Sequence, residues 1–157
     1  MPLPPPPAPV LVPMCRITCE VEALVTLGNA PLGERRFVPL GAGTVEGPEF
    51  SGTVLPGGVD WQWRRADGAL DIRAQYVLRA PDGGLVEVLS SGLRHGPPEV
   101  MDRLARGEPV DPRTYYFRTA LRFTTGAAAW QHLNTVLAVA VAQREAHRVL
   151  LDVYRVA

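Results

Sequence analysis

The strongest constraint on the fold of this chain is the clear alternation from Leu70 to Arg79, where Leu70, Ile72, Ala74, Tyr76 and Leu78 fall on one face and Asp71, Arg73, Gln75 and Arg79 on the other. Successive side chains of a β-strand point to opposite faces, so this pattern predicts a strand with one buried face and one wet face. Asp67-Gly68 precedes the segment and Asp82-Gly83 follows it. Asp-Gly pairs favour tight two-residue turns, because both turn positions require positive φ angles. The segment therefore pairs with a neighbour on each side in an antiparallel hairpin.

Extended runs separated by turns recur along the rest of the chain, which contains 15 glycines and 16 prolines. One short helix is expected at residues 97–106, where Val100, Met101 and Leu104 have helical spacing and Gly107 ends the pattern. A single helical turn is expected at 127–133. Together these patterns predict an all-β protein, a sandwich or a closed antiparallel β-barrel with one short helix. Further strands are expected at 16–26, 35–47, 51–58, 60–65, 85–93, 115–123, 135–144 and 148–156.

The N-terminal sequence MPLPPPPAPVLVPM predicts an extended polyproline segment. We interpret residues 1–14 as a flexible or docking arm and residues 15–157 as a single barrel domain. The arm lacks the basic and long apolar regions of a secretory signal, and no apolar stretch approaches the ~20 residues that span a bilayer. Cys15 and Cys19 lie four positions apart in an expected strand, which is too far for an unstrained disulfide. These features predict a cytoplasmic protein with no membrane partner.

The charge of the chain and the spacing of its motifs limit the kinds of reaction that it can catalyse. The chain has 16 arginines, no lysine and 16 acidic residues, so lysine Schiff-base chemistry is excluded and no net field attracts nucleic acid. His95, His132 and His147 have no metal-site spacing, and no phosphate-binding glycine motif is complete. We therefore expect no metal and no cofactor. Proton transfer and electrostatic stabilisation remain, which favour a lyase, isomerase or cyclase.

Two carboxylates are candidate catalytic bases. Glu87 alternates with Leu85, Leu89 and Leu93, so a buried face would desolvate it and raise its pKa; the alternative is a wet residue near the rim. Asp60 follows a Pro-Gly-Gly turn and precedes Trp61. It is either a carboxylate at a pocket mouth or a turn-capping side chain.

The remaining candidates would bind or protonate the ligand. Tyr116 and Arg118 would be a proton donor and an anion clamp if their face of the strand lines the interior, and solvated or subunit-contacting residues if it does not. Arg94 and His95 end a strand and would lie at a barrel rim, although surface polar residues look the same. Trp61 and Tyr76 would form a wall that stacks a flat ligand, although large aromatic residues are more often part of a core.

Five ordered motifs resemble the bacterial and fungal family known as domain of unknown function 3237. They are GAGTVEGPEFSGTVLPGGVDWQ, ADGALDIRAQYVLR, GLRHGPPEVMDRLARGEPVDP, YYFRT and DVYRV, and the resemblance extends from about Val21 to the C-terminus. It implies a calycin-like β-barrel that assembles into homo-oligomers.

The chain departs from the family pattern at several polar positions on adjoining strands. Glu87 and Ser90 stand where relatives carry Tyr and Asn, Thr124 stands where an acid is common, and Arg73 and Gln75 replace a common Asp and Arg. Gln75 is also counted among the ligand-binding candidates. These differences indicate a specialised substrate.

The sequence therefore predicts a cofactor-independent enzyme of specialised or aromatic metabolism that acts on a small organic molecule, of aromatic or polyketide-like type. Two alternatives stay open. The barrel is a non-catalytic binding protein, or it is a homo-oligomeric structural or assembly protein.

Overall fold

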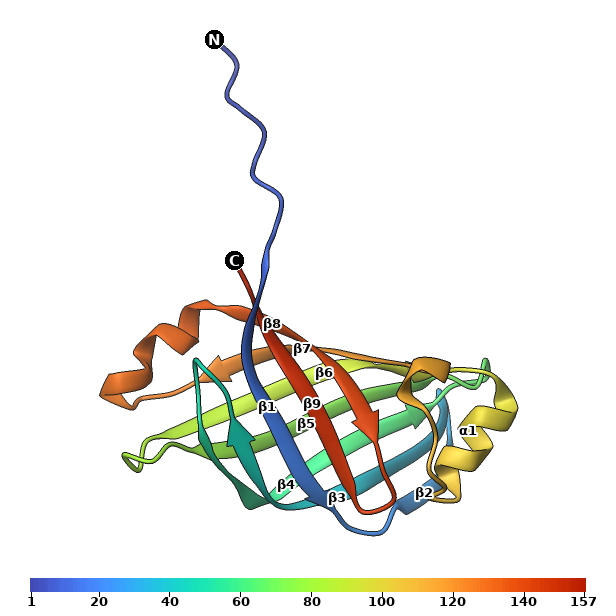
Figure 1. Cartoon of the computed structure of the whole chain (residues 1–157). Coiled ribbons are helices and arrows are strands. Elements are labelled where there is room, and N and C mark those ends of the chain that lie inside the picture. Colours follow the sequence, from blue (N-terminus) through green and yellow to red (C-terminus); the bar gives the residue numbers. More distant parts are fainter.

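Nine antiparallel strands form one continuous sheet that closes on itself in the computed structural model, which describes residues 1–157 (Figure 1). The sheet order is β1-β9-β8-β7-β6-β5-β4-β3-β2, and an additional β1–β3 pairing closes the barrel, so that β2 extends beyond it as a hairpin with β3. The expected antiparallel β-barrel is thus confirmed. The strands are β1 (Leu11–Val21), β2 (Val25–Ala30), β3 (Gly33–Glu46), β4 (Gly52–Arg64), β5 (Leu70–Arg79), β6 (Leu85–His95), β7 (Tyr116–Thr124), β8 (Leu137–Arg144) and β9 (Arg148–Val156).

The alternation in β5 produces the expected one-sided burial. Its burial alternates along the whole strand, and its register with β6 runs unbroken from the pair Leu70–Arg94 to the pair Arg79–Leu85. The neighbouring β4 is irregular, because its register with β5 shifts between Leu55 and Val59. This bulge merges the two runs expected at 51–58 and 60–65 into one strand.

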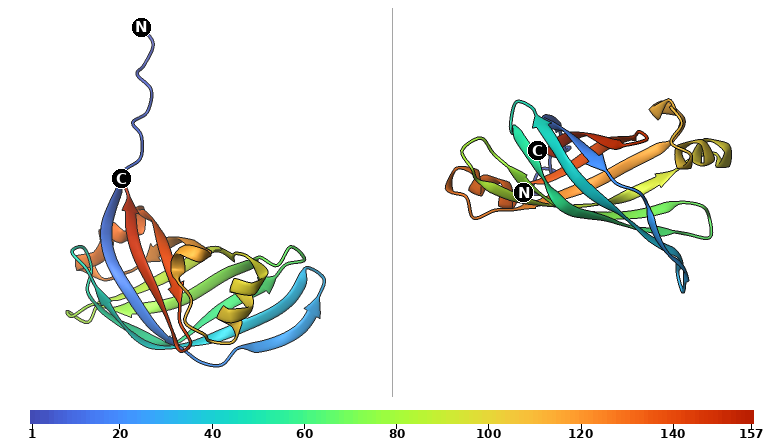
Figure 2. Two further views of the ribbon diagram at one scale, coloured as in Figure 1. Left: turned by 45° about the vertical axis from the view of Figure 1, so that its right-hand side comes forward. Right: turned by 90° about the horizontal axis from the view of Figure 1, so that it is seen from below.

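Helices cover the two ends of the barrel. The short helix α1 (Pro98–Ala105) packs across one end through Leu104, and the 3-10 helix η2 (Ala128–Thr135) lies at the other end (Figures 1 and 2). At the η2 end, Trp130 packs edge-on against Phe50 with ring centroids 4.8 Å apart. A third short element, the 3-10 helix η1 (Pro112–Thr114), leads into β7. None of the helices has the length and apolar composition needed to cross a membrane.

The N-terminal boundary differs from the expected one. Strand β1 starts at Leu11 and pairs with β9, and Met14 is only 1% exposed, so residues 11–14 belong to the barrel. The proline pattern does not predict this strand, because Pro13 lies where a strand tolerates proline. Pro13 is next to a register shift, and β9 is the only strand paired with β1 at this point, so the missing N–H leaves no second neighbour unpaired. Residues 1–9 carry no regular secondary structure and are exposed, and the chain extends away from the barrel there (Figure 1). The strand expected at 16–26 is also two strands, β1 and β2.

Candidate functional site

The barrel interior changes from apolar to polar along its axis. On β6, the inward side chains run from Val86 and Val88 to Ser90 and then Arg94, and the last of these lies towards α1. The same change occurs on β8, where three buried alanines precede Arg144. The end near η2 is therefore a packed core, whereas the end beneath α1 gathers polar side chains from several strands.

A hydrogen-bonded chain of three side chains starts on β3 and ends on β4. Arg36 donates from Nε to Oε1 of Gln62 at 2.9 Å, and Gln62 donates from Nε2 to Oδ2 of Asp60 at 2.8 Å. Asp60 and Gln62 are alternate residues of β4, so strand geometry directs both to the same side. Gln62 is 3% exposed, and it fixes the Asp60 carboxyl group in place.

Asp60 keeps one oxygen free. Its Oδ1 is buried and has no hydrogen-bond partner within the protein. Burial raises the pKa of Asp60 above its ordinary value, while the hydrogen bond from Gln62 and the charges of Arg94, Arg144 and Arg36 act in the opposite direction. Burial is the largest of these effects, so the net shift of the Asp60 pKa is upward.

Arg94 is the second unusual group. Its side chain is 8% exposed, its Nε is buried without a partner, and its guanidinium carbon lies 5.3 Å from the centroid of the Phe117 ring. Burial is the main cause that lowers the pKa of Arg94, to about 10, and the charge of Arg144 adds to the effect. The guanidinium therefore remains ionised at neutral pH, and no carboxylate oxygen lies within ion-pair distance of it.

Arg144 stands beside this group at the end of β8. Its Nη1 donates to the carbonyl oxygens of Glu145 and Arg148, and its backbone N–H donates to the Tyr115 hydroxyl at 3.0 Å. Backbone carbonyls orient the Arg144 guanidinium but do not neutralise it.

A pocket of about 130 Å³ opens between these side chains and α1. Asp60 is joined to its wall through Gln62. The lining includes four arginines, and α1 supplies one wall of it. The lining residues are Leu24, Arg36, Val38, Gln62, Arg64, Gly68, Leu70, Arg94, Met101, Asp102, Leu104, Ala105 and Arg144.

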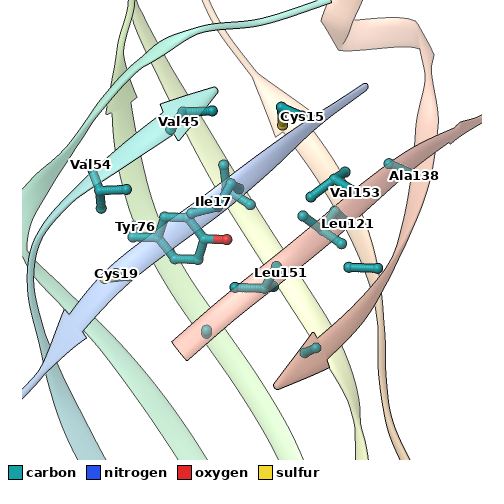
Figure 3. Packing of buried hydrophobic residues seen from close by; sticks show 14 of the residues in the cluster. Cys15, Ile17, Cys19, Val45, Val54, Tyr76, Leu121, Ala138, Leu151 and Val153 are labelled. Carbon is teal, nitrogen blue, oxygen red and sulfur yellow. The ribbon is translucent and has the colours of Figure 1, made fainter. Parts of the chain in front are cut away.

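Two further polar groups lie inside the barrel without partners, the hydroxyls of Tyr76 and Thr119. The Tyr76 ring points into the interior among apolar side chains (Figure 3), and burial raises its pKa far above the ordinary value. Gly58 makes room for Tyr76, since a Cβ at position 58 would lie 2.6 Å from the Tyr76 Cβ. The glycines of the Pro56-Gly57-Gly58 bulge therefore help to seat this tyrosine.

Three of the expected site residues lie on the outside of the barrel. The interpretation of Glu87 as buried is wrong, because Val86, Val88 and Ser90 are the inward side chains of β6, and the Leu85–Glu87–Leu89 side faces outward. Gln75 donates to Glu87 at 3.1 Å on the outer surface. Trp61 and Tyr76 do not form a common wall, since Trp61 lies with Gln75 and Glu87 along an outer groove of about 450 Å³, whereas Tyr76 points inward.

Tyr116, Arg118 and His95 also lie on the outer face. The rings of His95 and Tyr116 stack at 5.0 Å, and the Arg118 guanidinium lies 5.1 Å from the Tyr116 centroid. Tyr116 is 44% exposed and, with Leu93 and Arg118, lines an apolar groove of about 580 Å³. The face of β7 that carries Tyr116 and Arg118 therefore points away from the barrel interior, which is the second of the two alternatives given for it. Homo-oligomerisation through this groove stays a prediction.

The interior thus contains three of the expected residues, Asp60, Tyr76 and Arg94. The sequence reasoning missed Arg36, Gln62, Arg144 and Thr119. Gln62 could have been found from its alternation with Asp60, and Arg144 from its alternation with the alanines of β8. No group of three or more His, Cys, Asp and Glu side chains is placed to hold a metal ion.

Comparison with known proteins matches the whole barrel. The model of the family described as "Protein of unknown function (DUF3237)" matches residues 9–156. A UPF0311 protein of Bradyrhizobium diazoefficiens is 42% identical over 140 residues, which cover 89% of this chain and 91% of that protein.

Solved structures agree with this match. A conserved protein of unknown function from Rhodopseudomonas palustris superposes with a TM-score of 0.90 at 38% identity and covers 97% of this chain and 99% of its own. A beta-barrel like protein from Acinetobacter baumannii superposes with a TM-score of 0.85 at 34% identity, and the match covers 98% of this chain and 99% of that protein. An enzyme from Penicillium herquei superposes with a TM-score of 0.71 at 20% identity, and the match covers 99% of this chain and 100% of that protein. At this identity the likeness concerns the fold alone.

Proposed function

The chain belongs to the DUF3237 family, and from that premise we propose that it is a cofactor-independent enzyme that binds a small organic molecule at the polar end of its barrel and transfers a proton to or from it. In this proposal Asp60 is the acid or base, and Arg94 stabilises the negative charge that develops on the ligand. The reaction class is that of a lyase, isomerase or cyclase.

One observation carries the proposal. Asp60 Oδ1, Arg94 Nε, and the hydroxyls of Tyr76 and Thr119 are buried inside one barrel without hydrogen-bond partners. A buried polar group without a partner costs about 1–3 kcal/mol. A protein that served only as a scaffold would gain stability by replacing these groups with apolar ones. Arg94 lines the pocket beneath α1 and Asp60 is joined to it through Gln62, so these two groups support a ligand there that supplies missing partners, whereas the Tyr76 and Thr119 hydroxyls lie outside the pocket lining.

The two charged groups have complementary roles. A buried carboxyl group with a raised pKa exchanges protons closer to neutral pH than an exposed one does. Removal of a proton next to a carbonyl group leaves an enolate, and an ionised guanidinium in a water-poor site stabilises that charge more than bulk water does. Arg94 meets this requirement, because it is buried, ionised and not engaged by any protein acceptor.

Gln62 and Arg36 position the acid. The hydrogen bonds from Arg36 to Gln62 and from Gln62 to Asp60 leave Oδ1 as the oxygen that can receive a proton. The barrel of the Penicillium herquei protein, which is described as an enzyme, supports the view that this fold can carry catalysis.

A solvent-exchange experiment tests proton transfer before the natural substrate is known. Small ketones and 2-oxo acids are incubated with the protein in D₂O, and loss of the proton signal next to the carbonyl is followed by NMR. We expect the parent protein to accelerate exchange for at least one compound and Asp60→Asn to slow it by about 100-fold or more, since acid–base groups contribute about 10²- to 10⁴-fold.

Glu87→Gln is the matched control, because it makes the same change to a carboxylate on the outer face. It should exchange at the parent rate. Exchange that is equal in the parent and Asp60→Asn proteins contradicts the enzyme proposal and leaves the non-catalytic binding protein as the function.

A further inference from the structure

The polar end of the barrel holds more positive charge than its carboxylates balance. Arg36 lies 3.7 Å from Glu34, so this arginine has an acidic neighbour. Arg94 and Arg144 have none within ion-pair distance. The charge of each acts on Asp60, which is the one carboxyl group inside this part of the barrel. Arg64 and Asp102 also line the pocket, so four arginines face the three acids Glu34, Asp60 and Asp102, and one further negative charge would balance them.

Arg94 also has hydrogen-bonding capacity to spare. A guanidinium carries five N–H donors in a planar fork that fits a carboxylate with two parallel hydrogen bonds. No protein acceptor engages the Arg94 side chain, and its Nε is buried. A buried arginine without a partner in the protein is costly, and an anion that arrives from outside would supply the missing partner.

The volume of the pocket limits the size of the anion that it can hold. Its volume of about 130 Å³ is close to the ~150 Å³ of an apolar cavity that accepts benzene. Apolar side chains of α1, Met101 and Leu104, line part of the pocket, and Leu70 of β5 lies opposite Arg94 in the sheet. A small molecule with one charged end and one apolar end fits this lining.

We propose that the pocket between α1 and the barrel end binds small monocarboxylates, with the carboxylate on Arg94 and Arg144 and the apolar end against Met101 and Leu104. This inference rests on the proposed function, because it names the substrate class of the same site. Gln62 lines this pocket and is hydrogen-bonded to Asp60, so a ligand held there lies near the acid–base group of the proposed function.

The experiment is an NMR titration of the ¹⁵N-labelled full chain with acetate, propionate and benzoate at constant ionic strength. Propionamide has nearly the shape of propionate but no charge, and malonate and inorganic phosphate test a second charge and a different anion. We expect saturable binding of at least one monocarboxylate, with shifts at α1 and at the ends of β3, β4, β6 and β8. Propionamide, malonate and phosphate should bind at least ~10-fold more weakly than that ligand, because a charged hydrogen bond contributes about one to two powers of ten in affinity.

Arg94→Met removes the buried charge without removing any hydrogen bond within the protein. It should weaken monocarboxylate binding about 10- to 100-fold and should resist urea at least as well as the parent does. Arg144→Gln is a second variant, in case the first alters the fold. Arg122→Gln is the matched control, because Arg122 is an exposed arginine on the outside of β7.

The possible outcomes separate this inference from the proposed function. Monocarboxylate binding that depends on Arg94, without solvent exchange at any carbonyl compound, supports the anion pocket and contradicts the enzyme. Exchange of neutral ketones with no monocarboxylate binding contradicts the pocket and supports the enzyme. Absence of saturation with every monocarboxylate, preference for phosphate, or equal binding by Arg94→Met overturns the inference.

Discussion

The hydroxyl of Tyr76 offers a sharp test of the view that the barrel interior is built for a ligand and not for stability. The ring is buried within the core, and the hydroxyl has no hydrogen-bond partner (Figure 3). An unpaired buried polar group costs about 1–3 kcal/mol. Replacement of Tyr76 with Phe removes that cost and leaves only a small void, which costs a few tenths of a kcal/mol. Tyr76→Phe should therefore stabilise the protein by about 1–2 kcal/mol.

Tyr115→Phe is the matched control, because it makes the same change to another buried tyrosine. The Tyr115 hydroxyl accepts a hydrogen bond from the backbone N–H of Arg144 at 3.0 Å. Its removal leaves that N–H unpaired, so this variant should lose about 1–3 kcal/mol. The two identical substitutions thus have effects of opposite sign.

Equilibrium unfolding in urea, followed by fluorescence and circular dichroism at neutral pH, measures both variants. For a chain of this length a gain of 1 kcal/mol corresponds to about 2–4 °C in Tm. If Tyr76→Phe loses as much stability as Tyr115→Phe, the Tyr76 hydroxyl has a stabilising partner in the folded protein. That result would remove it from the set of groups that await a ligand.

Three further predictions concern the N-terminus, the thiols and the outer face. Removal of residues 1–9 should leave Tm within about 1 °C of the parent value. Removal of residues 1–14 should cost several kcal/mol of stability, because it deletes the first pairings of β1 with β9 and the buried Met14, whose loss alone is of order 2–5 kcal/mol. Equal Tm values for the two truncated proteins would show that residues 10–14 add nothing to the fold. Burial raises the pKa of Cys15 to about 12 and that of Cys19 to about 11, from an ordinary 9.0. The unfolded chain therefore loses these protons first, and stability should fall above pH 9 by about 1.4 kcal/mol per pH unit for each thiol. If the urea midpoints of the parent and of the Cys15→Ala/Cys19→Ala protein fall in parallel from pH 9 to 11, the thiols are not the cause. Val141 is an exposed residue in the groove beside Tyr116, and light scattering should show a homo-oligomer that Val141→Arg dissociates; an oligomer that survives the substitution uses another surface.

Local patterns in the sequence were sufficient for most of the fold. Alternation and the Asp-Gly pairs located β5, β6 and the hairpin between them, because strand period and turn chemistry are short-range properties. The expected two-residue turn is wrong in detail, since β5 ends at Arg79, β6 begins at Leu85 and no residue other than glycine has a positive φ. The helix expected at 97–106 is α1. The same short-range reasoning failed at residues 11–14, where pairing with β9 at the far end of the chain decides the conformation of a proline-containing segment.

The site was harder to predict, because alternation separates two faces of a strand without saying which one is inside. The leucines beside Glu87 favoured the wrong face of β6, and the true interior row includes Ser90 and Arg94. Apolar residues on the outer face are ordinary, since much of a protein surface is apolar. Arg36 and Arg144 reach the site only because β3 and β8 close into the same barrel end, which is a long-range property that no local spacing reveals.

In the proposed function Asp60 and Arg94 form one electrostatically coupled acid–base site inside the barrel, and a titration of Asp60 measures that coupling. The ¹³Cγ signal of Asp60, assigned by its loss in Asp60→Asn, is followed by NMR against pH in the parent protein and in Arg94→Met. Burial raises the pKa and the Arg94 charge lowers it, so the account predicts a midpoint above the ordinary value of 3.8 in the parent and a higher midpoint still in Arg94→Met. A midpoint at or below 3.8, or one that does not move when Arg94 is replaced, would contradict the account.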